Sequence, residues 1–132
     1  MEIKASTENG RVPVTIVHVD GDIDSTTYER FEAKMKELVG EGARDILIDL
    51  SHVRFVSSAG IRAINALFNE MRQVEPDVSD AEMHKGISAG TYKYPHLKLL
   101  QPSKETRATL QMVGLDMYFD IYDDLESAIE SY

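Results

Sequence analysis

Apolar, β-branched positions are concentrated in one stretch near the start of the chain. Residues 12–19 are mainly β-branched, and residues 3–6 can pair with them through a turn at residues 8–10, which contain Asn-Gly. Because Pro13 has no N–H to donate, it is expected at the beginning of its strand or along an edge. The pattern therefore predicts an antiparallel hairpin.

Two longer segments then show apolar residues at helical spacing. The first runs from about residue 25 to 39, with Ser25 or Asp24 as its cap, and the second from about 58 to 74. Between them, residues 45–50 (DILIDL) indicate a buried strand. The apolar stripes consist of Tyr28, Phe31, Met35, Leu38 and Val39 in the first helix, and of Ile61, Ile64, Leu67, Phe68 and Met71 in the second.

The second half of the chain continues the alternation after an interruption. Residues 75–95 mix Pro, Asp, Ser and Gly without a sustained period, which predicts a long loop whose Tyr92 and Tyr94 are exposed anchors for a partner. A strand is expected at residues 96–100 and a short one at 118–122. Two further helices are expected: one is capped by Ser103, carries Ala108, Leu110 and Val113 and ends at Gly114, and the other runs from a cap at Asp123 to about residue 131.

Strands that alternate with helices predict an α/β fold with right-handed crossovers. We expect a mixed, mostly parallel sheet of four or five strands with about four helices packed on it. No internal repeat or composition shift divides the chain, so residues 1–132 are expected to form one domain with the 75–95 excursion.

Composition narrows the classes of function. The chain has 132 residues, a net charge of −9 and no cysteine, which excludes disulfides and thiolate zinc sites. The acidic balance disfavours a nucleic-acid partner and an anionic membrane surface. The first residues lack the basic start and the apolar stretch of an export signal. No apolar run is long enough to span a membrane, so a cytoplasmic protein is expected.

Two adjacent hydroxyls, Ser57 and Ser58, follow the 45–50 strand and begin the second helix. A serine at this position can cap the helix, because the first turn leaves backbone N–H groups unpaired. A phosphoserine there would be favoured by the same N–H groups and would add about −1.5 to −2 charges. Ala59 and Gly60 leave the approach to the hydroxyls uncrowded. The residues alone favour the simple cap and leave the phosphorylation site open.

Four segments, in the right order, resemble the STAS-domain anti-sigma factor antagonists of bacteria, also called anti-anti-sigma factors. The loop Ser57-Ser58-Ala59-Gly60-Ile61-Arg62 resembles the phosphorylation loop of this family and the start of its helix. The other matching segments are Gly21-Asp22-Ile23-Asp24, Asp49-Leu50-Ser51 with Phe55, and Met112-Val113-Gly114-Leu115 followed by residues 118–122.

The resemblance implies a STAS-like fold and a switchable binding protein. It implies that the unphosphorylated chain binds an anti-sigma factor, often itself a serine kinase, and thereby releases a sigma factor for transcription. Ser58 matches the phosphoacceptor, and a separate phosphatase resets it. An acidic residue often precedes that serine, but Ser57 stands there and is the alternative acceptor. The residues expected to contact the partner are Asp22, Asp24, Ser57, Ser58, Gly60 and Arg62.

Other functions receive less support. A STAS interaction module without a phospho-switch, in a signalling or transport complex, is the main alternative. Hydrolysis by Ser58 with His52 and Asp49 lacks the Gly-x-Ser-x-Gly pattern. A metal site built from His84 and His96 with Asp80 or Glu82 lacks ligand spacing on one helix. No cofactor, metal ion or catalysis by the chain itself is therefore expected, and the oligomeric state stays open.

Overall fold

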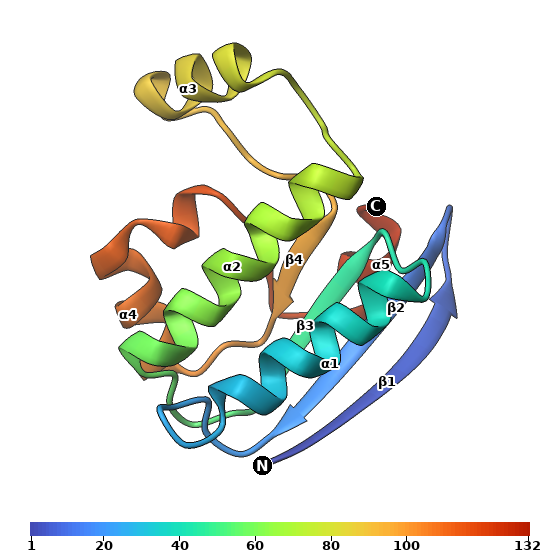
Figure 1. Ribbon diagram of the computed structural model, residues 1–132, viewed down its shortest axis with the longest axis vertical. Helices are drawn as coiled ribbons and strands as arrows, with labels where there is room; N and C mark the ends of the chain where they lie inside the picture. Colours follow the sequence, from blue (N-terminus) through green and yellow to red (C-terminus); the bar gives the residue numbers. More distant parts are fainter.

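A five-stranded sheet in the order β1-β2-β3-β4-β5 organises the computed structural model, which describes residues 1–132 (Figure 1). The first two strands pair antiparallel, and each later strand joins its neighbour in parallel. The predicted mixed, mostly parallel α/β fold and its opening hairpin are confirmed. The strands are β1 (Glu2–Asn9), β2 (Pro13–Asp20), β3 (Ile46–His52), β4 (Leu97–Leu100) and β5 (Ile121–Tyr122).

Five α-helices and one short 3₁₀ helix connect and cover the strands. They are α1 (Tyr28–Gly40), α2 (Ser58–Val74), α3 (Asp80–Ala89), α4 (Lys104–Val113), the 3₁₀ helix η1 (Leu115–Met117) and α5 (Leu125–Glu130). None of these helices has both the length and the apolar character needed to cross a membrane. The predicted stripes of α1 and α2 are buried, except that Tyr28 is only half-buried.

Several helix ends and faces differ from the expectation. Helix α1 begins at Tyr28, after Thr27, and neither Ser25 nor Asp24 caps it. The last helix is capped by Asp124, whose carboxylate accepts the Ser127 N–H at 2.9 Å, and not by Asp123. In α4, Leu110 is buried, but Ala108 and Val113 are exposed because only one narrow stripe of this helix meets the core.

The sheet has a larger and a smaller covered face. Val17 and Val19 of β2 point into the main core beneath α1 and α2, whereas Val14 and Ile16 point to a small cluster that includes Ala128 of α5. This alternation follows from the two-residue period of a strand. His18 and Asp49, which share the face of Val14 and Ile16 but lie outside this small cluster, are half-buried.

Lys98 of β4 is buried on the α5 face. Its ammonium donates to the carbonyl and the hydroxyl of Ser131, at 3.0 and 2.8 Å, and lies 4.4 Å from the ring centre of Tyr132. Burial lowers the pKa of Lys98. The Tyr132 hydroxyl in turn donates to the carbonyl oxygen of Ile46, so the last residues are fastened to the sheet.

The predicted long loop at 75–95 is wrong in its centre, because α3 forms there. Ser79 caps this helix by accepting the Glu82 N–H at 3.1 Å, and Gly90 ends it with a φ of 72°. The helix buries none of its residues completely. Met83, Gly86 and Ile87 are half-buried, and the side chains of Met83 and Ile87 pack against the core. Its apolar stripe is therefore too sparse to reveal a helix in the sequence.

Tyr92 and Tyr94 are buried, so the expectation that they are exposed anchors is wrong. They are 7% and 0% exposed and belong to a cluster of aromatic rings around Phe68 of α2. The Tyr94 hydroxyl donates to the carbonyl oxygen of Glu75 at 2.8 Å. The two tyrosines therefore anchor the segment around α3 to the core.

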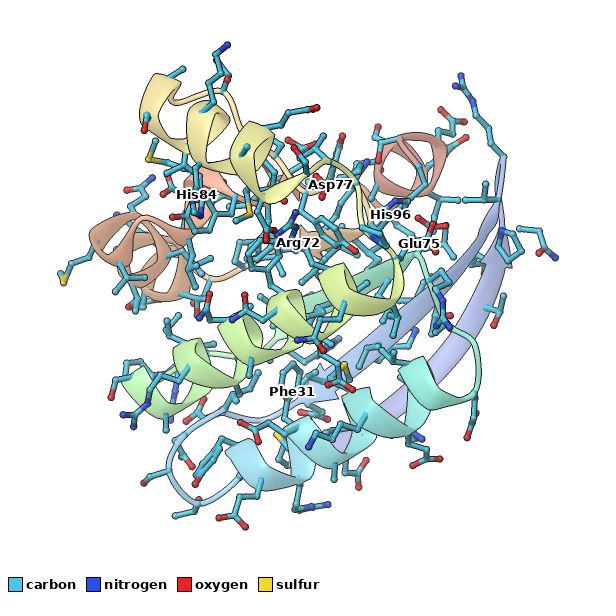
Figure 2. All side chains as sticks on the ribbon, turned by 45° about the horizontal axis from the view of Figure 1, so that its top comes forward. Phe31, Arg72, Glu75, Asp77, His84 and His96 are labelled. Carbon is cyan, nitrogen blue, oxygen red and sulfur yellow. The ribbon has the colours of Figure 1, made fainter.

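Arg72, near the end of α2, holds the start of α3 (Figure 2). Its guanidinium lies 3.2 Å from a carboxylate oxygen of Asp77 and 3.2 Å from one of Asp80, and it donates to the carbonyl of Val78 at 2.8 Å. Arg72 and Asp77 have only 12% and 8% of their side chains exposed. One partly buried arginine therefore makes most of the polar contacts between α2 and the α3 segment.

Candidate functional site

Two loops that are distant in the sequence meet at the amino end of α2. Ile23 and Val56 form a parallel bridge, in which the Ile23 N–H donates to Phe55 O at 3.1 Å and the Ser57 N–H donates to Ile23 O at 2.9 Å. Main-chain bonds therefore bring the Asp22–Asp24 turn against the loop that leads to Ser57 and Ser58.

Asp22 joins the two loops with both of its carboxylate oxygens. Oδ1 accepts the Phe55 N–H at 3.1 Å, and Oδ2 lies 3.3 Å from the Arg54 guanidinium. The Arg54 side chain is 85% exposed, so this ion pair is worth little by itself. The bond to the Phe55 N–H is therefore the contact through which Asp22 holds the loop.

Asp24 organises its own turn. Its Oδ1 accepts the N–H and the hydroxyl of Thr26, at 2.8 and 2.7 Å, and the hydroxyl of Thr27 at 3.3 Å. The bonds from Thr26 hold the pKa of Asp24 below its ordinary value. Asp24 therefore remains ionised at neutral pH and adds a negative charge to this surface.

The two serines have different environments. Ser57 caps α2, because its hydroxyl oxygen accepts the Gly60 N–H at 3.4 Å, and its side chain is half-buried. Ser58 is the first residue of the helix; it is exposed, and its hydroxyl makes no hydrogen bond to the rest of the chain. The sequence could not separate these two roles.

Gly60 is required by the close approach of the two loops. A Cβ added there would lie 2.6 Å from Ile23 O and 2.7 Å from a methyl group of Val56. Both contacts are shorter than any side chain tolerates, and one of them is to backbone. Gly60 is therefore buried and sets the spacing between the two loops. Because glycine has no side chain, it offers none for a partner to contact.

Arg62 is exposed on the first turns of α2. Glu29 raises the pKa of Tyr28, and Arg62 acts in the opposite direction, which places the charge of Arg62 near the start of α1. The structure therefore brings Asp22, Asp24, Ser57, Ser58 and Arg62 to one end of the molecule.

Two further residues belong to this end, and one of them, Ser103, was not predicted from the sequence to lie there. Ser103, the cap of α4, donates its hydroxyl to Arg54 O at 2.8 Å across 49 positions. Phe55 belongs to the recognised motif, but its 45% exposure gives the surface an apolar group that alternation alone does not predict. The cap at Ser103 was visible in the sequence, whereas its contact with Arg54 depends on tertiary packing.

The structure does not bring together the residues of the hydrolase and metal sites that were considered from the sequence. Asp49 accepts a hydrogen bond from His18, and His52 bonds to Ser51, so neither of them is paired with Ser58. His96 pairs with Asp45 at 2.7 Å. No three His, Asp or Glu side chains gather around a point that could hold a metal ion.

A family model described as the STAS domain matches residues 4–78. The chain therefore belongs to the STAS domain family, as the motifs predicted. Among its relatives, the putative anti-sigma factor antagonist BtrV of Bordetella bronchiseptica is 29% identical over 68 residues, which cover 52% of this chain and 59% of that protein. The anti-sigma-F factor antagonist RsfB of Mycobacterium tuberculosis is 24% identical over 116 residues, covering 88% of this chain and 79% of that one.

Solved structures share the fold at low sequence identity. A putative anti-sigma factor antagonist from Thermotoga maritima superposes with a TM-score of 0.72 at 18% identity, covering 97% of this chain and 92% of that one. The Bacillus protein SpoIIAA in its phosphorylated form gives a TM-score of 0.65 at 18% identity, with coverages of 98% and 97%. The five-stranded sheet and its helices are therefore those of a SpoIIAA-like STAS domain.

Proposed function

We propose that the protein is an anti-sigma factor antagonist that is switched off by phosphorylation of Ser58. In this proposal the unphosphorylated chain binds an anti-sigma factor, which is also the serine kinase, and so frees a sigma factor for transcription. A phosphatase restores the free hydroxyl. This regulation takes place in the cytoplasm, where transcription occurs.

One observation carries the choice of Ser58. Its hydroxyl is exposed and free of hydrogen bonds, whereas the Ser57 hydroxyl accepts a bond from Gly60 N–H and is half-buried. A kinase reaches a free hydroxyl without breaking a helix cap. The relatives support the class, because BtrV and RsfB are named as antagonists and SpoIIAA is known in unphosphorylated and phosphorylated forms.

The neighbouring charges explain how a phosphate would act. The Asp22–Asp24 turn is bonded to the loop before Ser58, and the carboxylate of Asp24 is held in its ionised form. A phosphoserine would add about −1.5 to −2 charges beside this turn. The surface that meets the anti-sigma factor would then become strongly negative at its centre and bind less tightly.

The direct test is phosphorylation by the cognate anti-sigma kinase. Incubation with the kinase and ATP is expected to add one phosphate, and Ser58→Ala should abolish it. Ser57→Ala is the matched control, which should still be phosphorylated. Ser58→Asp should weaken binding to the anti-sigma factor in calorimetry. Wild-type affinity of Ser58→Asp, or phosphate found on Ser57 alone, would overturn the proposed switch.

The second candidate is an interaction module without a phospho-switch, in a signalling or transport complex. It is favoured by Ser57, because capping of α2 is a sufficient structural role for a serine at this position. Binding to an anti-sigma factor that neither phosphorylation nor Ser58→Asp alters would select this candidate.

A further inference from the structure

Three polar side chains from three adjacent strands form a hydrogen-bonded row on the exposed part of the α5 face. The Ser6 hydroxyl oxygen of β1 lies 3.1 Å from Nε2 of His18 in β2. Nδ1 of the same imidazole lies 3.0 Å from Oδ2 of Asp49 in β3. None of these residues belongs to the surface around Ser58.

The register of the sheet produces this row. His18 lies directly opposite Asp49 in the parallel pair, and Ser6 is a diagonal neighbour of His18 in the antiparallel pair. Val17 and Val19 point into the main core, so His18 between them points to the other face. Diagonal neighbours on one face are within reach of a long side chain such as histidine.

The hydrogen bonds fix the tautomer of His18. Burial alone would raise the pKa of Asp49, but bonds from Ser51 and His18 outweigh it and hold that pKa below its ordinary value. The Ser51 N–H donates to Oδ1 at 3.0 Å, which orients the carboxylate. An ionised Asp49 requires a proton on Nδ1, so in the neutral imidazole Nε2 presents its lone pair to the Ser6 hydroxyl. This is the arrangement of nucleophile, base and orienting carboxylate that serine hydrolases use.

Two members of the row, Ser6 and His18, are accessible to solvent. Ser6 is exposed, and 44% of the His18 side chain is accessible. A hollow of about 200 Å³ adjoins His18 and Asp49, smaller than an ordinary ligand pocket. The charged and titratable groups that face His18 along this hollow are Glu2, Lys4, Asp20, Asp49 and His52. Three carboxylates against one lysine disfavour anionic substrates, and Lys4, opposite His18 in the antiparallel pair, is the only lysine or arginine that lines the hollow.

The geometry points to a nucleophilic acyl-transfer site at Ser6, His18 and Asp49, which takes small, activated esters that are neutral or cationic. The Ser6 oxygen attacks the ester carbonyl carbon, and its proton passes to His18 Nε2. The bond to the leaving oxygen breaks, and that oxygen takes the proton from His18. Water then attacks the acyl-serine with His18 as base, which releases the carboxylic acid and restores Ser6. Ser6 and His18 are the catalytic residues, and Asp49 positions His18.

Hydrolysis of p-nitrophenyl acetate by the full chain tests this activity. Ser6→Ala and His18→Gln should each reduce the protein-dependent rate by about tenfold or more, since general-base catalysis contributes at least that much. Ser88→Ala and His84→Gln are matched controls, because both residues are exposed on α3 and remote from the row. Circular dichroism should show that all four variants are folded.

Two further readouts identify the nucleophile and the charge preference. A fluorophosphonate should replace its fluoride with the Ser6 oxygen, and peptide mass spectrometry should locate the label at Ser6 in wild type and nowhere in Ser6→Ala. The anionic analogue 3-acetoxy-4-nitrobenzoate should react more slowly than p-nitrophenyl acetate. A label on another serine, an acetyl group on His18 alone, or an unchanged rate in Ser6→Ala would overturn the proposal.

The positioning role of Asp49 has its own readout. Asp49→Asn should lower the rate and move the midpoint of the rate–pH profile to lower pH, because the protonated imidazole loses its anionic partner. Asp49→Glu should restore part of the rate. A profile that keeps its midpoint in Asp49→Asn would contradict this role. Because the test needs no anti-sigma factor, it stands or fails independently of the proposed switch at Ser58.

Discussion

The two ends of α2 are held in different ways. At the amino end, main-chain bonds between residues 22–24 and residues 54–57 fix the loops, and the side chains of Asp22 and Ser57 complete them. At the carboxyl end, α3 is fastened mainly by the side chains of Arg72 and Tyr94. Backbone pairing keeps a hydroxyl at a defined position through many side-chain changes. A segment held mainly by two side chains can instead be loosened by a single substitution.

One of the two largest effects is expected where the backbones at the amino end approach each other. Gly60→Ala places a methyl group 2.6 Å from Ile23 O, so the loops must separate, at a cost of about 1–3 kcal/mol. Urea unfolding should report this loss. Gly40→Ala at the end of α1 is the control, since a Cβ there meets nothing within 4 Å. Equal stability of the two variants would show that the loops are not tightly joined.

At the carboxyl end, Arg72→Gln should cost about 1–3 kcal/mol, because it removes bonds to charged groups and leaves Asp77 poorly paired. The loss should be local. Hydrogen exchange should accelerate for the α3 amides while those of residues 54–60 keep their rates. Arg44→Gln, which removes a longer contact of 3.9 Å to Glu75, should leave α3 unchanged. Acceleration at both ends of α2 would remove the distinction between them.

A smaller effect separates the two serines at the amino end. Ser57→Ala removes the helix cap and should cost about 1 kcal/mol, whereas Ser58→Ala should leave the melting temperature unchanged. Ser57→Asp should keep the wild-type stability, because aspartate caps equally well. If Ser58→Ala were the more destabilised variant, the assignment of the cap would be wrong.

The smallest effect is the pH dependence of the Asp24 turn. The pKa of Asp24 lies below its ordinary value of 3.8, so its contribution to stability is present above that pH and is lost as the pH falls through the folded-state pKa. At neutral pH the wild type should have a higher melting temperature than Asp24→Asn, and this difference should vanish in acid. Differential scanning calorimetry between pH 7 and pH 2 measures it. If the difference in melting temperature persisted in acid, it would have to come from the shape of the residue 24 side chain and not from its charge.

Local signals in the sequence predicted most of the fold. The apolar stripes of α1 and α2, the hairpin and the glycine at the end of α4 were legible because each depends on residues a few positions apart. Helix α3 was missed because its apolar residues are too sparse to form a recognisable stripe. Tyr92 and Tyr94, which follow it, were misjudged because the burial of an aromatic residue in a loop depends on which elements pack against it.

In the candidate sites, too, the local features were predictable from the sequence and the long-range contacts were not. A serine pair at a helix start follows from the chain itself, and the resemblance to a family supplied the turn at Asp22 and Asp24. The bond from Asp22 to Phe55 spans 33 positions, and the row of Ser6, His18 and Asp49 spans three strands. Such contacts depend on strand register, which a single sequence does not define.

The order of the strands in space is the same as their order along the chain. During synthesis, each strand that emerges from the ribosome can therefore dock directly on the edge left by the preceding strand, without waiting for a later segment to be inserted between them. At every stage the growing sheet presents one unpaired parallel edge, first of β2, then of β3, then of β4. A chaperone that shields nascent edges would therefore bind successively later strands, until the two-residue β5 forms the final, short edge of the sheet.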